Sequence, residues 1–287
     1  MNILTSFIFF FSVLIIALIP FPLLYIISNF LRFVIQKVVK YRRTVVENNL
    51  SMCFPELDTK THNRLVGLSY QNLADNILEG IKDFSMTRKQ VLKRHKLLNP
   101  ELLEPYLKIG KSIIGVTGHY ANWEWGSLSA SLQIKTNVVA FYKKLNNPII
   151  DGFVRWSRAK FGTILASIRR TAETFEANAN ITTIYLMAAD QRILKKNLEK
   201  SYWVNFLGKK TPFLHGPEKY SRLYNLPVFY IDIQRVKRGF YEVKLSLLSD
   251  EPRELSEGEI TRKYAQKLEE IIIKKPQGWL WSHRRWK

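Results

Sequence analysis

The chain has 287 residues, of which 46% are hydrophobic, enough for one α/β domain with additions. Its 44 lysines and arginines outnumber 24 acidic residues, and this formal net charge of +20 favours anionic partners: nucleic acid, an acidic protein or an anionic membrane face. The single cysteine, Cys53, excludes an intramolecular disulfide framework and fits a reducing compartment, where a packed or idle thiol is favoured over a nucleophile.

The first 31 residues carry no charged side chain, a run long enough to cross a hydrocarbon core of about 30 Å. A cleaved signal peptide would have a basic start and a small-residue cleavage site, and this segment has neither. Because Pro20 and Pro22 should break the helix, we expect a membrane span up to about Ile19, then a second apolar helix along the surface. A buried apolar hairpin in a soluble protein is the alternative.

A basic segment without acidic residues follows the apolar run. Positive charge beside a membrane span stays on the cytoplasmic side, and it attracts anionic headgroups by about 1 kcal/mol per residue. We therefore expect the chain to lie on the cytoplasmic membrane, single-pass or monotopic, with the remaining residues on the cytoplasmic side. The basic residues are Arg32, Lys37, Lys40, Arg42 and Arg43.

Residues 41–110 show helical spacing of apolar residues, and from 111 onward short apolar strands alternate with helices. This alternation predicts an α/β fold with a mostly parallel central sheet flanked by helices. An antiparallel hairpin with Gly239 in its turn is expected at one edge, and a helix is expected after a capping start at Ser256. The predicted strands are 112–117, 137–142, 163–166, 181–188, 227–233 and 240–248, and the predicted helices between them are 121–132, 147–160, 171–178 and 215–224.

The pattern shows no internal repeat and no second globular domain. We expect an N-terminal membrane anchor and interfacial helix over 1–40, followed by one domain over 41–287. Within that domain, 41–110 is a helical lead-in, 111–250 is the α/β core, and 251–287 is a C-terminal helix with a basic aromatic tail.

Binding sites in open α/β sheets form at the carboxyl ends of strands. Gly118 and His119 directly follow the predicted strand 112–117, and Asp190 follows the strand 181–188. In one straight helix, His119 and Glu124 would point about 140° apart. They can cooperate if His119 lies on the preceding turn, where Gly118 supplies conformational freedom, and Glu124 lies early in the helix.

In that arrangement Glu124 accepts a hydrogen bond from one imidazole nitrogen of His119, and the other nitrogen acts as a general base. Glu124 would raise the histidine pKa, whereas a nearby helix amino terminus would lower it, and both directions stay open at this point. The pattern also fits a surface histidine that merely precedes a helix-start carboxylate.

The segment TGHYANWEW resembles the signature of the lipid A biosynthesis (late) acyltransferases, a branch of the lysophospholipid acyltransferase superfamily. That signature is a histidine followed, after four residues, by Asp or Glu. The likeness continues through FYKKLNNPIIDGFVRWSRAKFG, AADQ and FLGKKTPFLHGPEKYSRLYNLPVFY to the ending GWLWSHRRWK.

The resemblance implies a glycerol-3-phosphate acyltransferase-like fold at the inner membrane. It implies transfer of a fatty acyl chain from acyl carrier protein, or another acyl thioester such as acyl-CoA, to a hydroxyl of a lipid A precursor in lipopolysaccharide biosynthesis. Acyl carrier protein, the lipid and an anionic membrane surface would then be the partners, and no cofactor beyond the donor thioester is required. In the family the histidine is the base and the acid orients it.

The residues themselves agree with direct acyl transfer. An alcohol needs a base to take its proton during attack on a thioester. The sequence has no Gly-x-Ser-x-Gly elbow, nor a cysteine set beside a histidine, so an acyl-enzyme is not expected. The oxyanion of the tetrahedral intermediate needs donors, which we expect from the helix start at 120–122, including Asn122. The resemblance implies a further basic residue near SIRRT, where Arg169 is preferred to Arg170, and a solvated basic turn is the alternative.

Further candidates come from the resemblance or from their position. Asp190 matches a family aspartate and could bind the acceptor headgroup, although an aspartate after a strand is commonly only a turn or cap residue. Thr211 and Gly216 match a family turn that could touch the acceptor, whereas His283 is expected to be structural. No known metal-ligand spacing joins His119, Glu124 and Asp190. Residues expected to line the acceptor or contact phosphate are Tyr142, Lys143, Asn147, Arg155 and Arg158.

Three other functions compete with this prediction. The enzyme could acylate another membrane lipid or glycolipid, or it could be a lipid hydrolase that uses the same histidine to activate water. The chain could also be a non-catalytic basic protein that binds anionic membrane lipids. Nucleic acid is not an expected partner, because no nucleic-acid-binding motif is visible.

Overall fold

A seven-stranded sheet in the order β1-β9-β8-β2-β5-β3-β4 forms the centre of the molecule in a computed structural model, which describes residues 2–286 apart from the side chains of 196 and 197. Met1 and Lys287, the outermost residues of the expected anchor and tail, lie outside the described residues. The strands of this sheet are β1 (His95–Leu97), β2 (Ile113–Thr117), β3 (Asn137–Tyr142), β4 (Ile164–Ser167), β5 (Thr183–Ala188), β8 (Val228–Lys237) and β9 (Phe240–Ser249).

The sheet is mostly parallel, as the sequence predicts. Strand β2 pairs in parallel with β5 and β8, and β3 pairs in parallel with β5 and β4. Strand β9 returns antiparallel to β8, which confirms the expected hairpin, but β1 pairs outside β9 and forms the actual edge. A separate antiparallel hairpin joins β6 (Ser201–Phe206) to β7 (Lys209–Leu214). Neither β1 nor β6–β7 was predicted.

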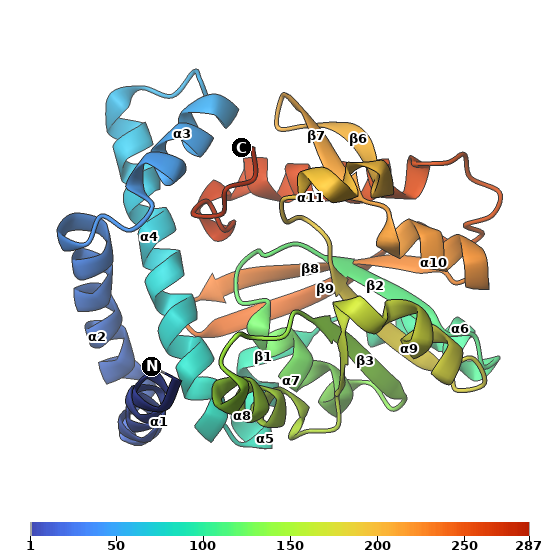
Figure 1. The fold of residues 1–287 in the computed structure, drawn as a ribbon, viewed down its shortest axis with the longest axis horizontal. Helices are drawn as coiled ribbons and strands as arrows, with labels where there is room; N and C mark the ends of the chain where they lie inside the picture. Colours follow the sequence, from blue (N-terminus) through green and yellow to red (C-terminus); the bar gives the residue numbers. More distant parts are fainter. Residues whose placement is uncertain (1, 287) are drawn as a thin grey trace.

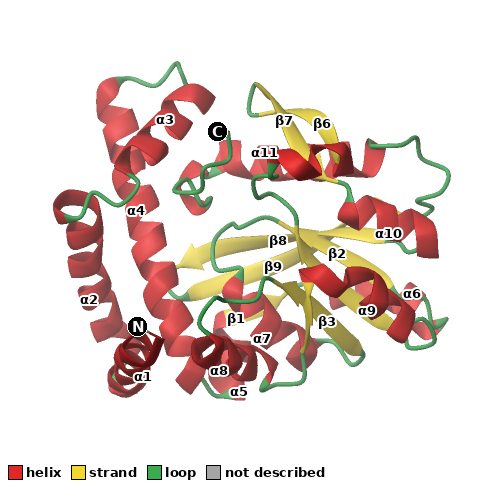
Figure 2. Ribbon diagram, viewed as in Figure 1, coloured by secondary structure: helices red, strands yellow, loops and turns green. Residues whose placement is uncertain are grey.

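Helices cover both faces of the sheet (Figures 1 and 2). Helices α5 and α7 lie on one side, and α10 and α11 lie on the other. The core between these layers contains Trp125 and Leu128 of α7 and Leu268 of α11, all fully buried. The helices that follow the N-terminal pair are α3 (Arg43–Cys53), α4 (Thr59–Lys82), α5 (Arg88–Arg94), α6 (Glu104–Lys108), α7 (Glu124–Gln133), α8 (Pro148–Ala159), α9 (Thr171–Ala177), α10 (Gly216–Tyr224) and α11 (Glu259–Lys274).

Two apolar helices begin the chain, α1 (Asn2–Leu18) and α2 (Phe21–Phe33). The break between them falls at Pro20, as expected, because Pro20 is the N-cap residue of α2 and Pro22 lies in its first turn. Helix α2 continues through one π-helical segment to Val38. In the part of the chain that the structure describes, the helix long and apolar enough to cross a membrane is Phe21–Val38. The sequence had placed the span in the preceding run up to Ile19, but α1 has only 17 residues.

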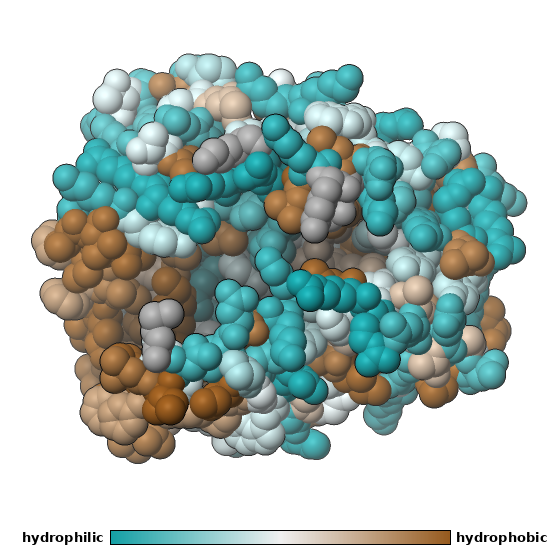
Figure 3. All heavy atoms as spheres, viewed as in Figure 1, coloured by the Kyte–Doolittle hydropathy of each residue, from teal (hydrophilic) through white to brown (hydrophobic). Residues whose placement is uncertain are grey.

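Both N-terminal helices are docked onto the domain (Figure 1). Helix α2 lies along α4, and the ammonium group of Lys82, at the end of α4, donates hydrogen bonds to the carbonyl oxygens of Ile16, Ala17 and Ile19 at 2.8–2.9 Å. Ile16 and Ala17 lie in the last turn of α1, where carbonyl groups lack an i+4 partner within the helix, and Ile19 directly follows that helix end. The outer faces of α1 and α2 are apolar and exposed, and Figure 3 shows them as a continuous hydrophobic surface.

Candidate active site

His119 lies at the carboxyl end of β2, where the neighbouring strand β5 brings Asp190 beside it. The register of the two strands pairs Thr117 with Ala188, so the residues that follow each strand emerge side by side. The His119 Nδ1 atom is 2.5 Å from Asp190 Oδ1, and the His119 backbone N–H donates to Asp190 Oδ2 at 2.9 Å. The indole N–H of Trp279 donates to the same Oδ2 at 2.8 Å. The carboxylate of Asp190 is therefore held by three donors.

The prediction that Glu124 accepts a hydrogen bond from His119 is wrong. Helix α7 begins at Glu124, as expected, but the carboxylate accepts from the indole of its neighbour Trp123 at 3.1 Å and forms an ion pair with Arg158 of α8. The imidazole nitrogen that it was to fix is occupied by Asp190. The physical reason is the sheet: adjacent parallel strands bring Asp190 closer to the imidazole than the sequence spacing brings Glu124.

The turn between β2 and α7 has a different shape from the one expected. Gly118 does not have a positive φ. It is needed for close packing, because a Cβ atom there would lie 2.7 Å from Leu268 Cδ1 and 3.3 Å from Asp190 Oδ2. The left-handed residue of the turn is Ala121, with φ of 51°. Its N–H donates to the carbonyl of Gly278 at 2.8 Å. A tertiary contact therefore stabilises a backbone conformation that alanine disfavours on its own.

Burial lowers the pKa of His119, but the carboxylates of Asp190 and Glu124 outweigh this effect and leave the pKa raised above its ordinary value. Burial would raise the pKa of Asp190, but the histidine and the hydrogen bonds from His119 and Trp279 lower it to about 2. Asp190 is thus an anion that accepts the hydrogen bond from Nδ1–H, and this contact sets the tautomer of the imidazole in its neutral form. The opposite nitrogen, Nε2, is then an acceptor, and it lies 3.0 Å from the exposed amide nitrogen of Gln191.

The imidazole remains accessible, because 17% of its side chain is exposed while Asp190 is almost fully buried. The indole of Trp123 packs edge to face on the ring, with centroids 5.1 Å apart. A histidine whose one nitrogen is fixed by a buried carboxylate and whose other nitrogen faces outward can take a proton from a bound hydroxyl group.

The other predicted site residues are not gathered around His119. The side chain of Asn122 is buried, donating to Glu79 Oε2 at 2.6 Å and accepting from the Trp125 backbone N–H at 3.1 Å, so its amide belongs to the scaffold. Arg169 is exposed at the end of β4, and two strands separate β4 from β2. Thr211 is buried in β7, where its hydroxyl accepts from the indole of Trp286 at 2.8 Å.

Among the residues expected to line the acceptor, two have clear structural contacts. Arg158 holds Glu124, as described above. Asn147 caps α8 by accepting from the Ile149 N–H at 3.0 Å, and it donates to the Asn2 carbonyl of α1 at 3.1 Å. Within residues 2–286, no cluster of three or more histidine, cysteine or acidic side chains could hold a metal ion.

The C-terminal tail supplies functional contacts that the sequence analysis missed. Trp279 and Trp281 are buried, so this part of the tail packs on the core rather than on a lipid interface. Trp279 completes the hydrogen bonds of Asp190, and His283 Nε2 accepts from the backbone N–H of Arg192 at 2.8 Å, a contact that fits a structural histidine. The only sequence signal for this role was the unusual density of tryptophan at the end of the chain.

An α/β protein with a carboxylate-fixed histidine at the carboxyl edge of a parallel sheet has the arrangement of an enzyme that uses general-base catalysis. Comparison with known proteins defines which one. The whole chain, residues 1–287, matches the family model of the bacterial lipid A biosynthesis acyltransferases. The chain belongs to this family and is an acyltransferase, as the TGHYANWEW segment had suggested.

Two curated proteins illustrate the relationship. The chain is 22% identical over 281 residues to a lipid A biosynthesis acyltransferase of Haemophilus influenzae, a match that covers 94% of this chain and 84% of that protein. It is 21% identical over 141 residues to a lipid A biosynthesis lauroyltransferase of Escherichia coli, covering 49% of this chain and 45% of that protein. Acyl transfer in lipid A biosynthesis is therefore the activity of the family to which the chain belongs.

Proposed function

We propose that this enzyme transfers a fatty acyl chain from an acyl carrier protein thioester to a hydroxyl group of a lipid A precursor. His119 acts as the general base, and Asp190 fixes its orientation. The observation that carries the proposal is the hydrogen bond of 2.5 Å between His119 Nδ1 and Asp190, which leaves Nε2 as the outward-facing acceptor. Acyl-CoA is the alternative donor, since the same chemistry applies to any acyl thioester.

The reaction needs one proton to move twice. As the acceptor hydroxyl attacks the thioester carbonyl, Nε2 takes its proton and a carbon–oxygen bond forms. Asp190 stabilises the imidazolium that results. When the tetrahedral intermediate collapses, the carbon–sulfur bond breaks and the imidazolium returns the proton to the leaving thiolate. Gln191 occupies Nε2 in this structure at 3.0 Å, so its exposed side chain must move aside for the acceptor.

Glu124 and Arg158 form the second charged pair near the histidine. The raised pKa of His119 already includes a contribution from Glu124, so we propose that this carboxylate acts on the imidazole through its charge. Arg158 holds it in place and has a guanidinium group suited to a phosphate or an oxyanion. We propose that Arg169, exposed after the end of β4, contacts the acceptor lipid.

We propose that the enzyme is attached to the cytoplasmic face of the inner membrane through α1 and α2, as a monotopic protein. Support comes from large exposed apolar side chains on both helices, such as Phe7 and Leu18 of α1 and Phe30 of α2. The opposite face of α2 hydrogen-bonds to α4 through Tyr25 and Ser28. A crossing by α2 would carry the charged groups of α4 into hydrocarbon, which is unfavourable. The excess of basic residues would favour anionic headgroups and an acidic carrier protein.

The test uses purified membranes that contain the enzyme, an acyl carrier protein thioester and a lipid A precursor. We expect acylated lipid as the product with wild type, and His119→Ala should reduce the rate by about 10²–10⁴-fold while the protein remains folded. Release of free fatty acid in place of acylated lipid would identify a hydrolase, and full activity of His119→Ala would remove the mechanism. Mass spectrometry of lipid A from a deletion strain should show one acyl chain fewer.

Membrane attachment has its own test. Carbonate extraction of membranes should leave the wild-type protein in the pellet, whereas charge substitutions at exposed positions such as Phe7→Glu and Phe30→Glu should release it. Recovery of wild-type protein in the supernatant would contradict attachment through α1 and α2.

A further inference from the structure

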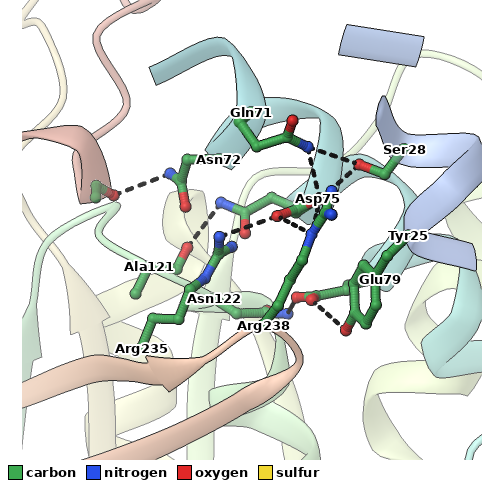
Figure 4. Close-up of polar contacts among 12 residues, drawn as sticks. Tyr25, Ser28, Gln71, Asn72, Asp75, Glu79, Ala121, Asn122, Arg235 and Arg238 are labelled. Atoms are coloured by element: carbon green, nitrogen blue, oxygen red, sulfur yellow. Dashed lines mark hydrogen bonds and ion pairs between the residues drawn. The ribbon is translucent and has the colours of Figure 1, made fainter. Parts of the chain in front are cut away.

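Two fully buried carboxylates, Asp75 and Glu79, lie one helical turn apart on α4 (Figure 4). Burying a carboxylate is costly unless it is paired and hydrogen-bonded, and apolar side chains usually stabilise a core as well or better. Because stability alone does not explain two buried carboxylates, we consider which parts of the molecule they connect.

Glu79 contacts three parts of the molecule at once. Its Oε2 atom accepts from the Asn122 side chain at 2.6 Å and from the Tyr241 hydroxyl of β9 at 2.7 Å. Its Oε1 atom accepts from the Tyr25 hydroxyl of α2 at 2.8 Å. One carboxylate thus joins the turn that carries His119, the central sheet and the N-terminal helix.

The same face of α4 holds the rest of that turn. The Asn76 side chain donates to the carbonyl of Ala121 at 2.7 Å, and the Asn72 side chain donates to the carbonyl of Gly278 at 3.1 Å. Asn72, Asn76 and Glu79 are spaced by four and three residues, which places them on one helical face. The left-handed Ala121 is thus held by two hydrogen bonds, one from Asn76 of α4 to its carbonyl and one from its N–H to Gly278 of the tail.

Asp75, one turn before Glu79 on the same face of α4, makes matching contacts. It accepts from the Ser28 hydroxyl of α2 at 2.5 Å and forms ion pairs with Arg235 and Arg238 of the β8–β9 hairpin at 3.0 and 2.6 Å. Helix α2 therefore hydrogen-bonds to α4 through the hydroxyl groups of Tyr25 and Ser28. The Glu79 carboxylate that accepts from Tyr25 also accepts from the side chain of Asn122.

We propose that Glu79 is a positioning residue that connects docked helix α2 to the turn carrying His119, so that a competent active site requires the N-terminal helices to be seated on α4. The inference rests on the proposed function, because it concerns the geometry of the same histidine. It gives α2 a role in catalysis that is separate from membrane attachment.

The test exchanges the two partners of one hydrogen bond. Glu79→Gln keeps only one acceptor oxygen, so the side chain can accept from Asn122 and Tyr241 or from Tyr25, but not from both sides at once. We expect kcat to fall by about 10–100-fold, since small displacements of catalytic groups have effects of this size. Asn122→Asp should also lower kcat, because two carboxylates would meet. The double variant Glu79→Gln/Asn122→Asp restores a donor and an acceptor, and the new aspartate can still accept from Trp125 N–H. We expect it to recover most of the lost kcat.

The pH dependence distinguishes positioning from mere loss of folded protein. The ionisable groups around the imidazole are Asp190 from β5, Glu124 from α7 and His283 from the tail. If the turn shifts, the bond to Asp190 weakens, so the acidic limb of kcat/KM moves to lower pH in Glu79→Gln and returns in the double variant. A loss of folded protein lowers the amplitude and leaves the limb unchanged.

Glu218 provides a matched control, because it is also a fully buried glutamate. It accepts from the backbone N–H groups of Gly258 and Thr261 at the start of α11, and within the described residues its hydrogen bonds do not reach α2 or the turn. Glu218→Gln should lower thermal stability without moving the acidic limb. Tyr25→Phe serves if Glu79→Gln does not fold, because it removes only the link to α2, and it should lower kcat and move the limb while membrane attachment is retained.

The result that would overturn the inference is a wild-type kcat and pH profile in folded Glu79→Gln and in Tyr25→Phe. A loss of kcat that the double variant fails to recover, with the limb unmoved, would also overturn it and would leave Glu79 as a purely structural residue. Both readings require an active wild-type enzyme and an inactive His119→Ala, so they are distinct from a failure of the proposed function, in which wild type itself transfers no acyl chain.

Discussion

The Nδ1 atom of His119 lies 2.5 Å from Oδ1 of Asp190, although 71 positions separate the two residues in the chain. Their contact depends on the parallel pairing of β2 with β5, which places the ends of the two strands together. The acid nearest to the histidine in sequence, Glu124, is instead paired with Arg158. The two carboxylates near His119 thus have different contacts and should have different effects when replaced.

Replacement of Asp190 by asparagine should lower kcat by about 10²–10⁴-fold, the range typical of lost general-base assistance. The asparagine amide can present a donor to Nδ1, which would favour the wrong imidazole tautomer. The measurement is acyl transfer in single-turnover experiments with a saturating donor. An Asp190→Asn enzyme that retains more than half of the wild-type kcat would contradict the assignment of Asp190.

The pH dependence of kcat/KM should report the raised pKa of His119. In the proposed mechanism the neutral imidazole is the active form, so activity should fall as the pH falls through that pKa, with a midpoint above the ordinary histidine value of 6.5. Glu124→Gln removes one of the two charges that raise the pKa, so the midpoint should move to lower pH. An unchanged midpoint in that variant would show that Glu124 has no electrostatic effect on the histidine.

Glu124 and Arg158 should behave as a coupled pair. Each single alanine variant leaves the remaining charge without its partner, so the double variant should lose less activity than the sum of the two single losses. For residues in direct contact, the expected coupling is about 0.5–3 kcal/mol in the free energy derived from kcat/KM. A double-mutant cycle measures it, and strict additivity would indicate that the ion pair does not contribute to catalysis.

Acid should destabilise the protein partly through His95. This buried residue shares a hydrogen bond of 2.6 Å with Ser129, and burial lowers its pKa to about 3. The unfolded chain takes up a proton at the ordinary pKa of 6.5 while the folded protein does not, so stability falls as the pH drops from there toward about 3. The His283 pKa, lowered by burial to about 4, acts in the same direction.

His95→Gln removes this titration and can keep a hydrogen bond to Ser129. The urea midpoint of this variant should therefore change less than that of wild type between about pH 7.5 and about pH 5. Equal pH dependence in wild type and His95→Gln would contradict the assignment.

Much of the fold could be predicted because local patterns determine it. The apolar strands from 112 to 248 and the helices between them were found within a few residues, and the prolines at 20 and 22 mark the break between α1 and α2. The short strand β1 was missed because three residues, His95–Leu97, leave too little alternation to detect. Strand β7 of the β6–β7 hairpin was missed because its residues were interpreted only as part of the family segment that begins at Phe206.

The candidate site could be predicted only in part. The position of His119 follows from the strand before it, but its partner depends on which strands are neighbours, and sequence spacing does not contain that information. Asn122 was expected at a helix start, but its side-chain amide donates a hydrogen bond to the buried carboxylate of Glu79 on α4. Trp279 contacts Asp190 from a tail that has no periodic pattern connecting it to the sheet.

The indole of Trp279 has one more implication, which concerns the order of synthesis. The last of the three donors to Asp190 belongs to residue 279 of a 287-residue chain, and it leaves the ribosome after every other part of the site. The carboxylate of Asp190 therefore reaches its full set of donors only after the C-terminal tail has been made and has packed on the core.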